Sequence, residues 1–110
     1  MAKSTKITQE IKEEIKKIIE KFNNENLKNR TIKYIAEYKG KYLYLKVKEP
    51  SVINPVARLK FTGDMKDWEF AIYKWSREKY DPDEWFFPGA EHADGTIEGA
   101  MRAGIEAYYQ

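Results

Sequence analysis

Apolar side chains recur every three or four residues near the start of the chain, at Ile7, Ile11, Ile15, Ile18 and Phe22. This spacing predicts an amphipathic helix with one narrow apolar stripe. Thr5 or Thr8 is expected to be its N-cap, and the helix is expected to end near Asn23-Asn24 because asparagine tolerates the left-handed conformation of a C-cap. The stripe spans about two heptads, which favours packing on a sheet of the same chain over a coiled coil.

After the helix, side chains of different kinds alternate with a period of two, as in a β-strand. Residues 31–38 and 41–48 are rich in β-branched and aromatic residues, and Lys39-Gly40 between them predicts a two-residue hairpin turn with Tyr38 opposite Lys41. Because alternate side chains point to opposite faces of a strand, the core face is expected to hold Ile32, Tyr34, Ala36, Leu43, Leu45 and Val47. The other face then holds Lys33, Ile35, Glu37, Tyr42, Tyr44, Lys46 and Lys48.

A second hairpin is predicted after residues 49–55, a connector in which two prolines oppose regular structure. Its strands are residues 56–62 and 68–76, with Phe61 opposite Phe70 and Leu59 opposite Ile72 on the core side. The outward positions are then Val56, Arg58, Lys60, Thr62, Glu69, Ala71, Tyr73 and Trp75. Both hairpins are thus expected to keep one aromatic and basic face.

Two further helical segments are predicted near the C-terminal end of the sequence. Asp81 as N-cap, Pro82 after it and Glu84 at the third helical position predict a short helical turn that ends at residues 87–89. A last helix, capped by Asp94 or Thr96, is predicted from the spacing of Ile97, Met101, Ile105 and Tyr108. The predicted fold is one α+β domain over residues 1–110, a four-stranded antiparallel sheet with a helix at each end, in the order α-β-β-β-β-α.

Composition narrows the possible functions. With 110 residues, 42% of them hydrophobic, the chain is expected to form one small domain without room for a deep substrate cavity. Cysteine is absent, which excludes disulfides, thiolate nucleophiles and cysteine-based metal sites. The sequence contains no apolar run long enough for a signal peptide or a membrane span, so we expect a cytoplasmic protein with no role in a membrane.

The net charge of +2 conceals an uneven distribution. Residues 1–62 carry 15 Lys and Arg against 7 Asp and Glu, a net charge of +8, whereas residues 63–110 carry 5 against 11, a net charge of −6. Such asymmetry is typical either of a surface for an anionic partner or of two halves that attract each other in the fold, and the second interpretation is favoured.

No motif for catalysis or metal binding is present. The polar segment 81–94 holds one histidine, His92, among several carboxylates, but zinc sites usually need more histidines, and Asp81, Glu84 and Asp94 are expected to be helix caps. Nucleophile elbows, Walker loops and dinucleotide fingerprints are also missing. The sequence therefore predicts a non-enzymatic protein with no metal and no cofactor.

Two surfaces are candidates for binding. The outward sheet face is expected to display Tyr42, Tyr44, Lys46, Lys48, Arg58, Lys60, Tyr73 and Trp75. Rings on a sheet can stack on bases while basic side chains contact phosphates, which makes single-stranded nucleic acid a possible ligand. The alternative is that the last helix, or Trp85-Phe86-Phe87, covers these rings and makes them a second core layer.

The second candidate surface is the cluster Trp85, Phe86 and Phe87, an anchor for a protein partner or for self-association if it is exposed, or otherwise a lid on the sheet. The functional hypothesis is a protein-interaction or regulatory module of uncharacterised role, with binding of single-stranded nucleic acid as the alternative.

Two resemblances bear on these hypotheses. The residues of 55–61, Trp68, 71–76 and Tyr80-Asp81 resemble the strand pair of small bacterial families of unknown function, a resemblance that implies a helix followed by an antiparallel meander and no activity. The order of elements is also similar to that of the double-stranded-RNA-binding domain. The last helix, however, opens with Asp94, Thr96 and Glu98 where that family has a basic cluster, so no RNA-binding residue is carried over.

Overall fold

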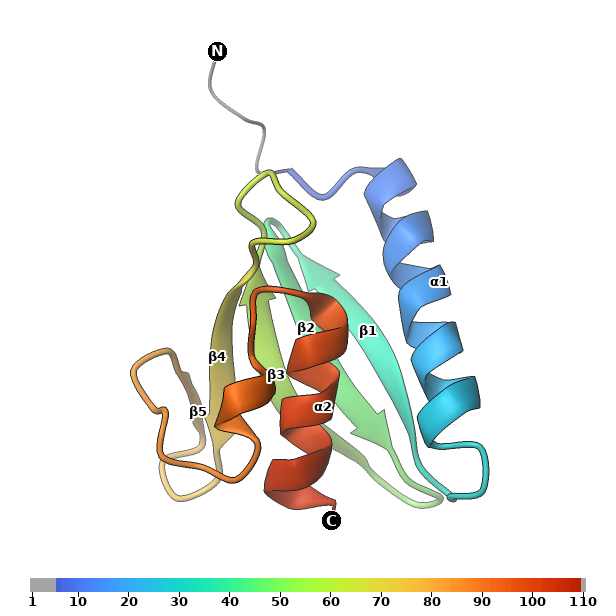
Figure 1. Ribbon diagram of the computed structural model, residues 1–110, viewed down its shortest axis with the longest axis vertical. Coiled ribbons are helices and arrows are strands. Elements are labelled where there is room, and N and C mark those ends of the chain that lie inside the picture. Colours follow the sequence, from blue (N-terminus) through green and yellow to red (C-terminus); the bar gives the residue numbers. More distant parts are fainter. Residues whose placement is uncertain (1–5, 110) are drawn as a thin grey trace.

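The computed structural model describes residues 6–109 and shows two helices packed on a five-stranded antiparallel sheet (Figure 1). The elements, in chain order, are α1 (Gln9–Asn26), β1 (Lys33–Lys39), β2 (Tyr42–Lys48), β3 (Ile53–Lys60), β4 (Glu69–Lys74), β5 (Lys79–Asp81), the 3₁₀ turn η1 (Ala90–His92) and α2 (Ile97–Tyr108). Neighbouring strands in the sequence are neighbours in the sheet, in the order β1-β2-β3-β4-β5. The α+β prediction is confirmed, with five strands instead of four.

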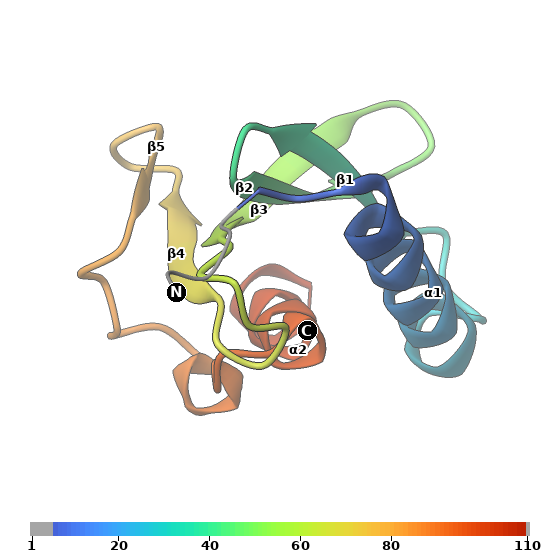
Figure 2. The ribbon, with the colours of Figure 1, turned by 90° about the horizontal axis from the view of Figure 1, so that it is seen from above.

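Both helices lie on the same side of the sheet, here called the inner face (Figure 2). One hydrophobic core joins this face to the apolar sides of α1 and α2 and includes Ile15, Tyr34, Leu45, Ile72 and Met101. Within residues 6–109, no helix covers the opposite side of the sheet, the outer face. The last helix therefore does not cover the predicted aromatic and basic positions.

The first helix begins as the sequence predicts and ends one turn later than expected. The Thr8 hydroxyl accepts a hydrogen bond from the Ile11 N–H, while the alternative cap, Thr5, lies outside the described residues. Asn23 does not end the helix because its side chain has another role: its amide accepts from the Tyr34 N–H (2.9 Å) and donates to the Tyr34 carbonyl (3.1 Å). The helix then continues to Asn26, with Leu27 as C-cap.

The first hairpin has the predicted faces in a different register. Lys39 pairs with Tyr42 and Tyr38 with Leu43, so the turn residues are Gly40-Lys41 and not Lys39-Gly40. Gly40 has a φ of +60°, the conformation needed at the first central position of a type II′ turn. The shift is two residues, so each side chain stays on its predicted face.

Strand β3 begins earlier than the prolines suggested. Glu49 and Val52 close a tight turn (N···O 2.8 Å), and Pro55 lies inside the strand, opposite Lys46. A β-bulge there accommodates the missing N–H of proline. The extra residue is Val56, which is fully buried against α2 and not outward as predicted.

The second hairpin also has a corrected register. Leu59 pairs with Phe70 and Ala57 with Ile72, in place of the predicted Phe61–Phe70 and Leu59–Ile72 pairs. The core side is unchanged because the shift is again an even number of residues.

Residues 75–84 differ most from the sequence-based prediction. Strand β4 ends at Lys74, a turn follows, and β5 returns beside β4 with Tyr80 opposite Tyr73. The short turn expected after Asp81 forms, with the Asp81 carboxylate accepting from the Asp83 N–H (2.9 Å), but it is not helical. The Glu84 carboxylate accepts from the Phe86 N–H (2.8 Å) and pairs with Lys74 instead of reaching back as in a capping box. The hydrogen bond with Lys74 has the largest effect and that with the Phe86 N–H the next, and together they hold the pKa of Glu84 below its usual range.

The second helix approaches the sheet closely at a glycine. Thr96 is its N-cap, accepting from the Gly99 N–H, and Asp94 in turn accepts from the Thr96 N–H. The Tyr34 hydroxyl crosses the core to donate to the Met101 carbonyl (2.8 Å). Gly104 lies over this position, where Tyr34 and Val56 leave no space for a larger side chain.

We expect Gly104→Ala to destabilise the protein by about 1–3 kcal/mol, the usual cost of overpacking a core. A Cβ at this position would lie 2.4 Å from both the Tyr34 hydroxyl oxygen and Val56 Cγ1. Chemical denaturation measures the free energy of unfolding. Glu98→Ala, on the exposed side of the same helix, is the control and should change it by less than about 0.5 kcal/mol. Equal stability of the two variants would contradict the close approach.

Candidate functional site

The outer face collects the predicted binding residues on one surface. Four of them alternate along β2, two along β3, and Tyr73 lies on β4: Tyr42, Tyr44, Lys46, Lys48, Arg58, Lys60 and Tyr73. The eighth, Trp75, lies in the turn after β4 and is half-exposed. The alternation inferred from the sequence therefore brings these side chains together.

The aromatic rings of this face form a continuous diagonal row, here called the ring row. Its members are Tyr42, Tyr44, Tyr80, Tyr73 and Trp75, in that spatial order, with successive centroids 6.3, 5.4, 5.1 and 5.1 Å apart. Three of the four contacts are edge to face, a favourable arrangement that leaves the rings in different orientations. Sequence reasoning missed Tyr80 because it missed β5.

The outer face is concave along the ring row. Tyr44 lies on β2 and Tyr80 on β5, with two strands between them. In a flat sheet the backbones of these strands would be roughly 14 Å apart, three strand spacings. The Tyr44 and Tyr80 rings nevertheless touch, with centroids 5.4 Å apart, and Figure 2 shows the β4–β5 end turned out of the plane of β1 to β3. The sheet thus curls around the outer face as well as twisting.

Arg58 lies at the centre of this concave surface. Its guanidinium carbon is 4.9 Å from the Tyr42 ring centroid and 5.7 Å from that of Tyr80, which are distances of cation–π contact. Burial raises the pKa of Tyr80 to about 12, and the Tyr44 and Tyr73 hydroxyls add to the increase, while Arg58 opposes it. The ring row is therefore partly desolvated and held around a fixed positive charge.

Cations outnumber carboxylates on the rest of the outer face. By strand alternation it carries Lys33, Lys39, Lys46, Lys48, Arg58 and Lys60 against Glu37 and Glu69. The Lys46 ammonium pairs with Glu37 at 2.8 Å, and Lys60 lies beside Tyr42 in the register. The ring row is thus in contact with one arginine, and lysines lie around it.

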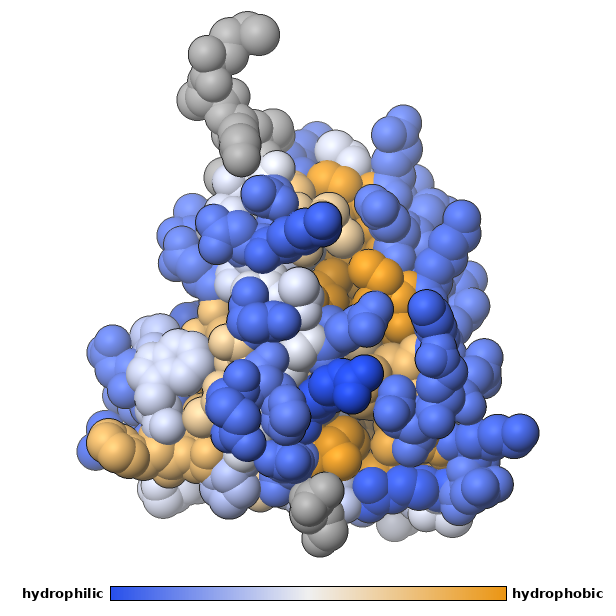
Figure 3. All heavy atoms as spheres, in the orientation of Figure 1, coloured by the Kyte–Doolittle hydropathy of each residue, from blue (hydrophilic) through white to orange (hydrophobic). Residues whose placement is uncertain are grey.

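The cluster at residues 85–87 lies at the opposite side of the sheet. Trp85 and Phe87 pack on Phe70, an inner-face residue, with centroids 5.8 and 6.0 Å away, so they do not cover the ring row. Phe87 is partly buried there, Trp85 is half-exposed, and Phe86 is 98% exposed. Figure 3 shows hydrophobic atoms projecting at the lower left, beside the loop before η1, in addition to those visible between α1 and α2.

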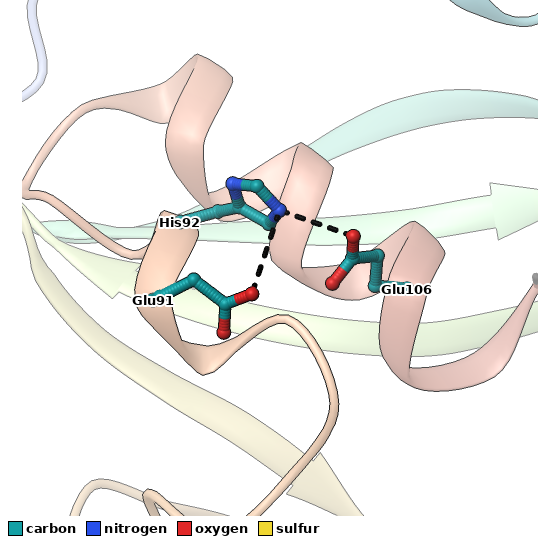
Figure 4. A group of neighbouring side chains, drawn as sticks. All are labelled: Glu91, His92 and Glu106. Carbon is teal, nitrogen blue, oxygen red and sulfur yellow. Dashed lines mark ion pairs between the residues drawn. The ribbon is translucent and has the colours of Figure 1, made fainter.

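The lone histidine takes part in a small ionic cluster between η1 and α2. Figure 4 shows the Glu91 and Glu106 carboxylates both directed at the His92 Nε2, at 4.0 and 3.2 Å. Their ligand atoms lie within 4.8 Å of one another, so these are the described residues best placed to hold a metal ion. Both carboxylates lie within ion-pair distance of the imidazole, and this pairing accounts for the arrangement without a bound cation.

Comparison with protein-family models, with curated proteins and with solved structures gives no significant match. Neither α1 nor α2, the α-helices of the described residues, has the length and apolar character of a membrane-spanning helix. Functional inference accordingly depends on the geometry of the outer face.

We expect Tyr80 to make stability sensitive to alkaline pH. Because the folded-state pKa is about 12 and the usual value is 10.0, the neutral phenol favours the folded state below pH 10, and this contribution is lost as the pH rises from 10 towards 12. Tyr80→Phe removes the ionisable group, so its unfolding free energy should fall less steeply over this range than that of the wild type. Denaturant titrations at pH 9, 10 and 11 measure the difference; parallel curves would show that Tyr80 titrates normally.

Proposed function

We propose that the outer face binds single-stranded nucleic acid, with bases stacking on the ring row and phosphates contacting the surrounding lysines and arginine. The observation that carries this proposal is the concave row of five partly exposed rings, two of them in contact with Arg58, which no described helix covers. Base stacking on aromatic side chains is sequence-tolerant, and a positive surface attracts the backbone. The proposed role is non-enzymatic and cytoplasmic.

Single-stranded ligands fit this surface better than duplexes. Bases inside a duplex are stacked on one another, so a ring can stack on a base only where the strand is unpaired. The rings lie within a concave face and do not project as a helix or an arm that could enter a groove. The curvature of the sheet therefore favours a flexible single strand.

The charge of the outer face favours nucleic acid over a protein partner. Cores of protein–protein interfaces are enriched in aromatic residues and arginine, which the ring row and Arg58 would also satisfy, but such interfaces are depleted in lysine. Five lysines share the outer face with the rings: Lys33, Lys39, Lys46, Lys48 and Lys60. Lysine ammonium groups around aromatic rings match the alternation of base and phosphate along a strand.

The test uses two half-exposed tryptophans as a matched pair. Trp75 ends the ring row, whereas Trp85 lies over the inner face. We expect Trp75→Ala to weaken binding of a fluorescein-labelled dT12 or rU12 oligonucleotide by about 5- to 150-fold, the loss of one stacked base at about 1–3 kcal/mol. Trp85→Ala should bind as the wild type does. Fluorescence anisotropy at 50 and 200 mM salt measures the affinities, and circular dichroism checks the fold.

The outcomes separate the alternatives. Binding that weakens at high salt and depends on Trp75 supports the proposal, because phosphate contacts release counterions. Absence of binding at 50 mM salt, or equal loss in both variants, would contradict it.

A second function is favoured by one observation, the 98% exposure of Phe86. A fully exposed phenylalanine beside a half-exposed tryptophan is a typical anchor for a protein contact. The partner that can be tested directly is a second copy of this chain, which would bind through the loop between β5 and η1.

We expect the wild-type protein to self-associate at concentrations above about 10⁻⁴ M, typical of a small weak interface. Phe86→Ser should then remain monomeric at the same concentrations, because it removes the apolar anchor without touching the core. Sedimentation equilibrium measures both, with Trp75→Ala as a control on the other face. A monomeric wild type, or association unaffected by Phe86→Ser, would rule out this contact.

A further inference from the structure

A basic groove continues the outer face beyond the β1–β2 turn. It has a volume of about 800 Å³ and lies between this turn and the start of α1. Its polar lining consists of four lysines, Lys6, Lys12, Lys39 and Lys41, next to Tyr42 and Tyr44. Among residues 6–109, no carboxylate lines it. A groove with four ammonium groups and two phenol rings is complementary to a chain of phosphates that carries aromatic bases.

The walls of this groove are fixed by the core. Ile7, which also lines the groove, is 5% exposed and so anchors the segment before α1 in the core. Lys12 lies over the Tyr38 ring, with its ammonium 5.0 Å from the centroid. At the tip of the turn, Gly40 has no neighbouring atom within 4 Å of a Cβ position, so a ligand backbone has space there. Lys12 is thus held against a ring at one wall of the groove, and the exposed Lys39 and Lys41 lie beside Gly40 at the other.

We propose that a bound strand enters or leaves the outer face through this groove, with two of its phosphates held by Lys39 and Lys41. The inference rests on the proposed function and specifies the path of the strand. Tyr42 and Tyr44 both line the groove and begin the ring row, so a strand leaving it meets the stacking rings without a break. From there the row leads diagonally to Trp75 at the other end of the sheet.

On this path, the two ends of the site contribute different interactions to binding. The groove contributes electrostatic attraction, which depends on salt and not on the base, and the ring row contributes stacking, which depends little on salt. A ligand that spans both regions must contain several nucleotides. The expected footprint is roughly four to six nucleotides, near the lower limit of known single-stranded sites.

The test measures the salt dependence of affinity in the double variant Lys39→Gln/Lys41→Gln. Each phosphate contact contributes about −0.7 to the slope of log K against log salt for single strands, so losing two contacts should reduce its magnitude by about 1.4. Lys17→Gln/Lys21→Gln, on exposed positions of α1 outside the groove, removes the same charge and is the matched control. Anisotropy with dT12 between 50 and 300 mM salt gives the slopes, with dT2 as a ligand too short to span both regions.

The proposal predicts a smaller slope for the double variant, an unchanged slope for the control, and tighter binding of dT12 than of dT2. If the wild type binds dT12 in a Trp75-dependent manner but both lysine pairs have the same effect, the outer face binds the strand and the groove does not guide it. If the wild type binds neither ligand at 50 mM salt, the proposed function itself is wrong and this path is wrong with it.

Discussion

The close approach of α2 to the inner face is the constraint on which the rest of the structure depends. Gly104 allows the helix to lie directly on Tyr34 and Val56, and the Tyr34 hydroxyl joins the two layers by its bond to the Met101 carbonyl. With α1 beside it, this arrangement uses both α-helices of the described chain on one side of the sheet. The aromatic residues of the other side therefore pack on one another, and no described helix covers them.

A β-bulge in β3 places one additional side chain in the core. Pro55 cannot donate to the ladder, so β3 accommodates an extra residue there and Val56 turns inward to meet α2. Bulges increase the local twist of a sheet. The curl that brings Tyr80 of β5 to Tyr44 of β2 follows on the next strands, and it converts separate rings into one row. The same strand thus contributes Val56 to the core and Arg58 to the outer face.

The sequence predicts side-chain faces better than it predicts pairing or strand number. Faces follow from alternation, which an even register shift preserves, so the residues of β2 and β3 that were predicted to face outward do so, although Tyr38 pairs with Leu43 and not Lys41. Strand β5 was missed because the turn at 75–78 has no Gly, Pro or Asn, and Glu78 adopts a φ of +51° without a sequence signal. The concavity and the lysine groove depend on tertiary packing, which no local pattern encodes.

The side-chain amide of Asn23 affects how readily the sheet edge can pair with another molecule in concentrated solution. A strand at the border of a sheet offers unpaired N–H and C=O groups to any other extended chain, and this is how many sheets begin to aggregate. Asn23 occupies both groups of Tyr34 on β1 as a neighbouring peptide would. The opposite border is β5, which is only three residues long. One helix side chain and one short strand thus limit growth of the sheet from molecule to molecule, while its aromatic surface stays uncovered.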